Sequence, residues 1–244
     1  MYHWYPDKGK MAIYSYTKTK APISKKLLSV ISVVLILTGL TLLTAVIYPI
    51  VAFEIYYSSK YANLIKPIPD DNKSLTGNLS EVLGTAFTDY TKASIWFPKA
   101  SRVNLVRNSS QYLLSIPKLK VNKANVIVGS DDLSKSLIHF TGPLPGSRGN
   151  PVIFGHSTIL LFYNPSDYKA IFSKLPDLEL GDEIFIELDN VTYTFRVYDM
   201  FITSPSDLSV LEQNTDDEEI TLITCVPPGT YLKRFIVKAR LEKI

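Results

Sequence analysis

Charged side chains are absent from one long stretch near the N-terminus, from Leu27 to Phe53. This stretch has 27 residues and is apolar almost throughout, whereas a membrane-spanning helix needs about 20 apolar residues. It is too long and too apolar to be one face of a globular helix, so we predict a transmembrane helix over 27–53. A cleavable signal peptide is the alternative, but its apolar region usually has about 7–15 residues and ends at a small-residue site. No clean site of that kind follows, which favours an uncleaved anchor.

From about residue 111 onward, the pattern changes to short apolar or alternating runs that are typical of β-strands. Besides the run that opens this region, they lie at 150–156, 183–188, 191–202, 218–225 and 234–241. Asp189 and Asn190 separate two of these runs, and both residue types tolerate a positive φ, which predicts a tight hairpin turn. Many strands and little helix favour a small β-barrel or sandwich.

One helix is expected in this region, over residues 165–174. Asn164 is a good N-cap and Pro165 fits the first helical position. Asp167 would complement the dipole at the N-terminal end of such a helix.

The segment between the apolar run and the strands has a different composition. Residues 66–80 are rich in Pro, Asp, Asn and Ser, which is typical of a solvated linker. Residues 85–99 carry more aromatic side chains and could pack on the domain or cover a groove, although a helical spacer is the favoured interpretation. The predicted organisation is a basic tail (1–26), the transmembrane helix (27–53), a stalk (54–110) and a strand-rich folded domain (111–244).

The formal net charge of +3 is distributed unevenly along the chain. Residues 1–26 carry six lysines against one aspartate, whereas residues 111–244 carry thirteen basic and seventeen acidic side chains. Because the folded domain is the acidic part, we expect no nucleic-acid partner. Positive residues before the apolar run keep the N-terminus cytoplasmic and export residues 54–244 in a single-pass topology.

Cys225 is the only cysteine, so an intramolecular disulfide and every multi-cysteine metal site are excluded. The period of two in the last run places Phe235, Val237, Ala239 and Leu241 in the core and Arg234 on the other face. Pro and Gly residues between the last two runs predict a chain reversal. If these strands pair antiparallel, Cys225 and Arg234 are neighbours at one end of the sheet.

A thiol beside a guanidinium suggests acyl-transfer chemistry. A nearby cation lowers the pKa of a thiol, and a guanidinium can hold a developing oxyanion. His156 ends its own strand and would supply the acid and base. Each residue also has a structural interpretation: Cys225 as a small buried apolar residue, His156 as a hydrogen-bonded strand end, and Arg234 as a solvated charge.

Three motifs resemble those of the sortases, the cysteine transpeptidases of bacterial cell surfaces. Residues 221–225 read Thr-Leu-Ile-Thr-Cys and match the family's TLxTC motif at every fixed position. Residues 149–156, GNPVIFGH, are similar to the segment in which the family's histidine closes a strand. Arg234 opens the following strand, as the family's arginine does. The resemblance covers about 111–244.

The resemblance implies a closed eight-stranded β-barrel with one or two short helices. It also implies that the Cys225 thiolate attacks the carbonyl after Thr in an LPxTG-like sorting signal and forms a thioacyl intermediate. His156 would protonate the leaving amine and then act as base for an amine acceptor, while Arg234 binds substrate and steadies the oxyanion. Thr224 and Ile223 would be secondary substrate contacts. The Asp-Pro-aromatic lid motif of some sortases is absent, and Trp96-Phe97-Pro98 is only a faint substitute.

The partners implied are surface proteins with a sorting signal, an amine acceptor such as a peptidoglycan precursor or a pilin lysine, and the bacterial cell membrane. No cofactor is expected. Asp131-Asp132 and residues 216–219 are similar to calcium-binding loops of class A sortases, but solvated turns are the favoured interpretation.

Two other functions remain open. An inactive sortase-like barrel could serve surface assembly or adhesion. A transpeptidase of the L,D type would carry its histidine and cysteine close together in one motif, whereas His156 and Cys225 are 69 positions apart.

Overall fold

The computed structural model describes residues 25–61, 89–97, 111–213 and 215–242. The chain divides into two compact units, residues 1–45 and residues 46–244. The linker predicted over 66–80 lies outside the described residues.

The long N-terminal helix α1 runs from Lys25 to Tyr61 and contains the predicted span 27–53. By length and composition, Lys26–Ala45 could cross a membrane, and none of this stretch is buried within the protein. The hydroxyls of Thr38 and Thr44 each donate to a carbonyl four residues earlier, at 2.8 and 2.9 Å. These hydroxyls therefore need no water, which suits an apolar surrounding.

The last turns of α1 belong to the second unit and pack on the barrel. The Tyr61 ring meets Phe235 edge-on at 5.0 Å, and its hydroxyl donates to the carbonyl of Pro176 at 2.9 Å. Lys233 forms an ion pair with Glu54 at 3.1 Å. The predicted stalk thus begins as a packed helical end, and its parts at 62–88 and 98–110 lie outside the described residues.

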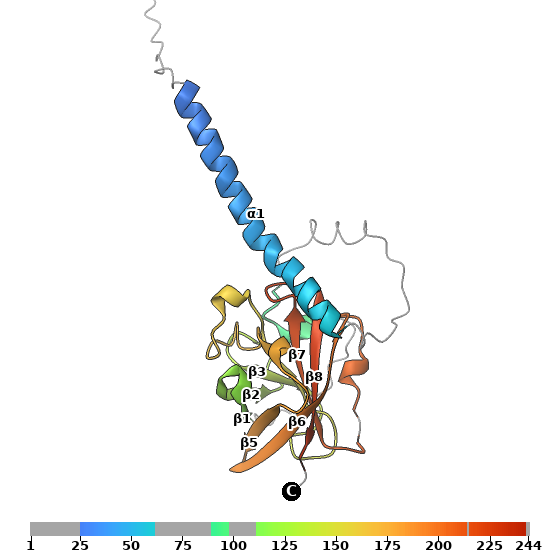
Figure 1. Cartoon of the computed structure of the whole chain (residues 1–244). Helices are drawn as coiled ribbons and strands as arrows, with labels where there is room; N and C mark the ends of the chain where they lie inside the picture. Colours follow the sequence, from blue (N-terminus) through green and yellow to red (C-terminus); the bar gives the residue numbers. More distant parts are fainter. Residues whose placement is uncertain (1–24, 62–88, 98–110, 214, 243–244) are drawn as a thin grey trace, which may run out of the picture. The chain divides into compact units, whose positions relative to one another are not determined.

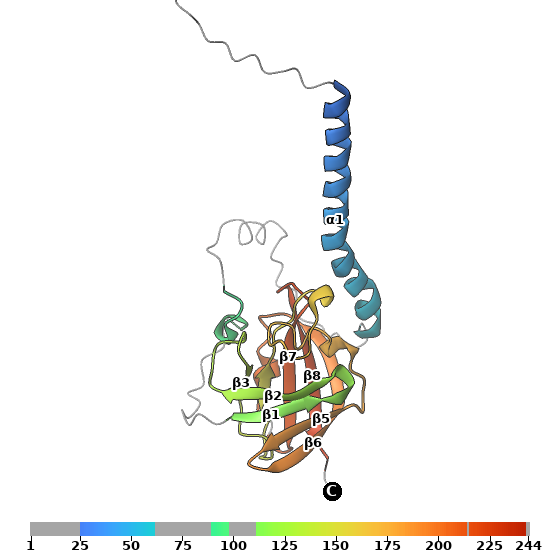
Figure 2. The same ribbon diagram turned by 90° about the vertical axis from the view of Figure 1, so that its left-hand side faces the viewer.

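Eight strands close into a barrel in the order β1-β2-β3-β4-β7-β8-β6-β5, which confirms the predicted fold (Figures 1 and 2). The pairs β2–β3 and β4–β7 are parallel and the others antiparallel. The strands are β1 (Gln111–Ile116), β2 (Val121–Val128), β3 (Leu137–Thr141), β4 (Val152–Phe154), β5 (Glu183–Leu188), β6 (Val191–Thr203), β7 (Glu219–Val226) and β8 (Lys233–Leu241).

The predicted α-helix over 165–174 is wrong, because this stretch forms a series of turns. The side chain of Asn164 accepts from the backbone N–H of Ser166 at 3.0 Å, and Asp167 does the same for Lys169. Such side chains compete with the helical hydrogen bonds that the N-cap pattern had suggested. Besides α1, the described helices are short 3-10 turns: η2 (Ala93–Ile95), η3 (Pro117–Leu119), η4 (Leu160–Phe162), η5 (Leu175–Asp177) and η6 (Ser209–Leu211).

The hairpin turn at Asp189 and Asn190 is confirmed, with φ of 50° and 63°. Sequence reasoning missed β2 and β3. In β2, Lys123 has a φ of 48°, which breaks the alternation of buried and exposed residues on which strand prediction depends.

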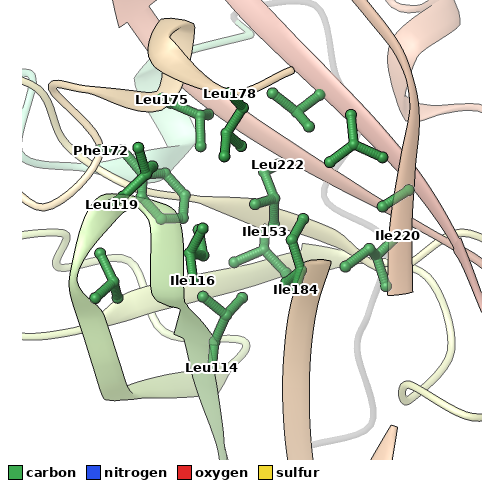
Figure 3. Packing of buried hydrophobic residues seen from close by; sticks show 14 of the residues in the cluster. Leu114, Ile116, Leu119, Ile153, Phe172, Leu175, Leu178, Ile184, Ile220 and Leu222 are labelled. Carbon is green, nitrogen blue, oxygen red and sulfur yellow. The ribbon is translucent and has the colours of Figure 1, made fainter. Parts of the chain in front are cut away.

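Two apolar layers lie on either side of the barrel wall. The inner layer fills the barrel, and Figure 3 shows Ile153, Ile220 and Leu222 among its packed side chains. The outer layer covers the other face of β4, β7 and β8, where Ile223 and Cys225 are buried. The remaining fully buried members of this outer layer are Ala93, Trp96, Phe97, Leu133, Ile138, Val152, Phe154, Val210 and Ile236. The outward face of β7 near Cys225 is therefore not solvated.

Candidate active site

Cys225 and Arg234 are direct partners across the antiparallel pair β7–β8, as predicted. Directly opposite residues in an antiparallel pair have side chains on the same face, with Cβ atoms about 4.5–5.5 Å apart. The core positions predicted in β8 are also confirmed, since Phe235, Val237 and Ala239 lie in the inner layer. The thiol and the guanidinium therefore share the outer face of the barrel.

His156 follows β4, the parallel neighbour of β7 on the side opposite to β8. In this pair Val152 lies beside Thr221 and Phe154 beside Ile223, a constant offset of 69 positions. Carried two residues further, the same offset sets His156 beside Cys225. The backbone stays in contact beyond β4, because Gly155 N–H donates to the carbonyl of Ile223 at 3.1 Å.

The polar contacts of His156 fix its ring and its tautomer. Nδ1 lies 2.9 Å from the carbonyl of Ser157, and because a carbonyl only accepts, Nδ1 carries the proton. The other ring nitrogen, Nε2, is then left with a lone pair. Ser157 in turn donates its hydroxyl to the carbonyl of Cys225 at 2.7 Å, which ties the histidine segment to β7.

Thr224 and Ile223 are placed differently from each other. Successive side chains of a strand alternate, so Ile223 shares the outer face with Cys225, whereas Thr224 points to the opposite face. The hydroxyl of Thr224 donates to the carbonyl of Gly155 at 2.8 Å. Contact of either residue with a substrate stays a prediction.

Arg234 is almost fully buried, with 2% of the residue's surface exposed. One terminal nitrogen donates to the carbonyl of Tyr231 at 3.1 Å, and the other donates to the carbonyl of Trp96 at 2.9 Å. Nε has no partner, and among the described residues only this atom and Ser136 Oγ are buried side-chain nitrogen or oxygen atoms without a hydrogen bond. An unpaired donor beside a thiol is available to an incoming acceptor.

Residues 89–97, which we call the strap, cover this cluster. Trp96 is fully buried: it stacks on Phe154 at 5.3 Å between ring centroids and meets His156 edge-on at 6.4 Å. The guanidinium of Arg234 lies 5.4 Å from the centre of the Trp96 ring, within range of a cation–π interaction. Under this cover the Cys225 thiol has no exposed surface.

Two further contacts fasten the strap. Tyr90 stacks on Tyr231 at 3.7 Å, and the Asp131 carboxylate accepts the backbone N–H of Ser94 at 2.7 Å. The interpretation of this segment as a helical spacer is therefore wrong for 89–97, whereas the alternative, packing on the domain, is confirmed. The high aromatic content of this segment was the sequence signal for its packing on the domain. The sequence did not indicate that the candidate active site lies beneath it.

Burial dominates the protonation of the thiol and the imidazole. It raises the pKa of the Cys225 thiol to about 11, and the Arg234 guanidinium offsets only part of the rise. Burial also lowers the pKa of His156 below its ordinary value of 6.5, and the hydrogen bond to Ser157 opposes this shift only in part. With the strap in place, the pair is a neutral thiol and a neutral imidazole at pH 7.

A second buried histidine and the acidic residues considered for calcium serve contacts within the protein. His139 is buried between the Tyr112 hydroxyl and the carbonyl of Gly142, each at 3.1 Å. Within the described ranges, no three His, Cys, Asp or Glu side chains gather into a group that could hold a metal ion. Of the acidic residues considered for calcium, Asp131 fastens the strap and Asp217 forms an ion pair with Arg240 at 2.6 Å.

The sequence model of the family described as "Sortase domain" matches residues 114–242, more than half of the chain. The chain belongs to the sortase family. Members of this family are transpeptidases, so the chain is an enzyme of that type. The matched residues contain Cys225, His156 and Arg234 and all of the barrel except the start of β1.

Individual relatives are distant. Sortase A of Listeria monocytogenes is 25% identical over 175 residues, which cover 71% of this chain and 72% of that protein. Sortase D of Bacillus subtilis is 27% identical over 131 residues, which cover 51% of this chain and 60% of that protein. Among solved structures, the Clostridium perfringens Sortase D5 transpeptidase shares 32% identity, covers 55% of this chain and 79% of its own, and has a TM-score of 0.47.

Truncating the strap's tryptophan is expected to expose the thiol of this sortase. In Trp96→Ala, Cys225 loses its apolar cover, so its pKa falls toward the ordinary value and alkylation by iodoacetamide accelerates by about tenfold or more. The measurement is the alkylation rate followed by intact mass, since Cys225 is the only cysteine. The control is Tyr198→Ala, an aromatic truncation on β6 near the far end of β8. Equal alkylation rates in wild type and Trp96→Ala, with both folded, would contradict the covering role.

Proposed function

We propose that this sortase cleaves an LPxTG-like sorting signal through a Cys225 thioacyl intermediate and transfers the acyl group to an amine. The observation that supports this most directly is the position of Cys225, which is paired with Arg234 on β8 and lies beside the extension of β4 that carries His156. These three residues supply a nucleophile, an acid and base, and an anion stabiliser, the set that acyl transfer requires.

The first half of the reaction begins from the neutral pair. As Sγ of Cys225 bonds to the scissile carbonyl carbon, its proton passes to Nε2 of His156, which the hydrogen bond at Nδ1 leaves free to accept it. The carbonyl oxygen gains negative charge, and the guanidinium of Arg234, with its unpaired Nε, stabilises it. The imidazolium then protonates the leaving amine as the C–N bond breaks, which leaves a thioester on Cys225 and a neutral histidine.

In the second half, an amine acceptor attacks the thioester carbonyl. His156 takes a proton from the attacking nitrogen and returns it to the departing Cys225 sulfur. The free enzyme and a new amide bond result, so no cofactor is required for the balance of the reaction.

Ile223 and Thr224 have different roles in this proposal. Ile223 lies on the face of β7 that carries Cys225 and would contact apolar parts of the sorting signal. Thr224 acts as a positioning residue, because its hydroxyl holds the carbonyl of Gly155, directly before His156.

The strap must move before a peptide reaches the thiol. The carbonyl of Trp96 already accepts a hydrogen bond from Arg234, in the way a substrate carbonyl would. Substrate binding therefore replaces one backbone carbonyl with another at the guanidinium. Because the Arg234 guanidinium keeps a carbonyl partner throughout, moving the strap does not leave a buried charge unpaired.

Sortases act on surface proteins that carry sorting signals, and the apolar stretch of α1 together with the family indicates membrane anchoring. For this chain we propose a single-pass protein of the bacterial cell membrane, with the basic tail 1–26 in the cytoplasm and the barrel outside. The acceptor amine would be that of a peptidoglycan precursor or of a pilin lysine.

Trapping of the acyl-enzyme tests the proposed chemistry. Incubated with an LPxTG-type peptide, the full-length wild type should gain the mass of the acyl fragment at Cys225, and Cys225→Ala should gain none. Added hydroxylamine should release the adduct, because the bond is a thioester. A wild type that never forms the adduct, while Trp96→Ala with its more open site also fails, would support the inactive barrel that serves assembly or adhesion.

Arg234→Lys is expected to lower kcat/KM for peptide cleavage by about 10- to 100-fold. The ammonium keeps the charge but lacks the planar fork and the Nε donor that point at the oxyanion. Lys233→Arg, at the neighbouring exposed position, is the matched control and should cleave normally. Near-normal turnover by Arg234→Lys would remove Arg234 from the mechanism.

The pH dependence of kcat/KM for the peptide should follow the two buried groups. Activity falls as pH drops through the pKa of His156, below 6.5, because a protonated imidazole cannot accept the thiol proton. No alkaline decline is expected until pH approaches about 11, where Cys225 loses the thiol proton that the mechanism passes to His156. In Trp96→Ala the alkaline decline in kcat/KM should begin at a lower pH, because the pKa of the less buried thiol is lower. A wild-type alkaline limb near about 8.5, the ordinary value for a free thiol, would contradict the role of burial.

A further inference from the structure

Exposed apolar side chains outside α1 are concentrated in two loops beside the candidate active site. Nine such large side chains are exposed among the described residues, and six of them lie in these loops. The six are Ile159, Leu160, Leu161, Phe162, Tyr231 and Leu232, which we call the apolar loop surface. Leu161 and Phe162 are the most exposed in their loop, at 84% and 66%.

The two loops form one continuous surface. A methyl group built on Gly229 would lie 2.6 Å from Cγ1 of Ile159, so the loop between β7 and β8 rests against the loop that follows His156. In both views the yellow turn that contains η4 lies at the same end of the barrel as the β7–β8 loop (Figures 1 and 2). A contiguous patch of exposed apolar side chains on a folded domain marks an interaction site.

This surface lies next to the point where the apolar run of α1 ends. Leu232 precedes Lys233, whose amine pairs with Glu54, the first charged residue after Phe53. The helix residues just before Glu54 belong to the same compact unit as the barrel, and Tyr48 and Val51 among them are exposed. The ion pair between Glu54 and Lys233 thus joins the end of the apolar run to the loop that carries Leu232.

The rim of the apolar loop surface has the composition of a membrane interface. Tyr163 follows Phe162, and the amine of Lys174 lies 4.6 Å from the centre of its ring. Tyr231 is exposed, and Lys233 directly follows Leu232. Tyrosine rings and lysine amines flanking apolar side chains are typical of protein at the level of lipid headgroups, where the amines meet anionic phosphates.

We propose that the apolar loop surface lies in the headgroup region of the bilayer into which α1 inserts. The barrel then has a second contact with the lipid besides its helix, at the loops that lead away from His156 and Cys225. The active site would consequently face the membrane surface, where an acceptor held on a lipid is concentrated. The proposal rests on membrane anchoring but not on catalytic activity.

The test uses the full-length protein in vesicles of phosphatidylcholine and phosphatidylglycerol. Because Cys225 is the only cysteine, a single environment-sensitive fluorophore can be attached at Leu161→Cys in a Cys225→Ala background. The matched control is Val191→Cys, an exposed apolar position in the β5–β6 turn. Val191 begins β6, whereas Thr203 at the other end of β6 pairs with Arg234, so the control lies at the far end of the barrel.

The label at 161 should be quenched by lipids that carry a nitroxide near the headgroup and shielded from aqueous iodide. The label at 191 should show the reverse. Equal access of iodide to both labels, in protein that floats with the vesicles, would overturn the proposal and leave a protein partner as the occupant of this surface. Protein that does not float with the vesicles would overturn the membrane anchoring itself. Unchanged thermal unfolding of both variants shows that neither substitution disturbs the fold.

Discussion

The pairing of β7 with β4 on one side and β8 on the other is the constraint on which the site depends. The parallel register of β4 and β7, extended two residues beyond Phe154, brings His156 beside Cys225, and the antiparallel register of β7 and β8 pairs Arg234 with it. Hydrogen bonds from Ser157 and Thr224 extend the β4–β7 contact beyond the end of β4. A slip of one residue in either register would turn a reactive group to the inner face, so the barrel's closure holds the chemistry in place.

Desolvation sets the resting state of this sortase. Arg234 attracts the thiolate, but burial in the outer apolar layer, to which the strap contributes Trp96 and Phe97, removes the water that would stabilise a charged sulfur, and the second effect is larger. The same cover holds Trp96 against Arg234 through both its ring and its carbonyl. The site is therefore kept neutral and closed, and the groups that bind the strap are those that substrate would need. Reactivity and access are coupled through one short segment.

Much of the fold could be predicted from local patterns. The apolar stretch of α1, the β5–β6 hairpin and the alternation in β8 each follow from residue type and spacing alone. The predicted helix over 165–174 failed because Asn164 and Asp167 bind nearby backbone N–H groups in turns. The strand β2 was missed because Lys123 adopts a positive φ that no pattern of apolar residues reveals.

The sequence by itself determined the membrane-type helix, the strand-rich domain and the three residues whose motifs resemble those of sortases, because these depend on composition and on contacts close along the chain. Only the tertiary structure decided that the outer face of β7 is buried and that Trp96 covers the thiol. The difference has a physical reason: a strand pattern tells which residues share a face, but the solvation of that face depends on what folds over it. Residues 89–97 come from more than a hundred positions before Cys225, and the burial to which they contribute, more than the neighbouring arginine, keeps its thiol neutral.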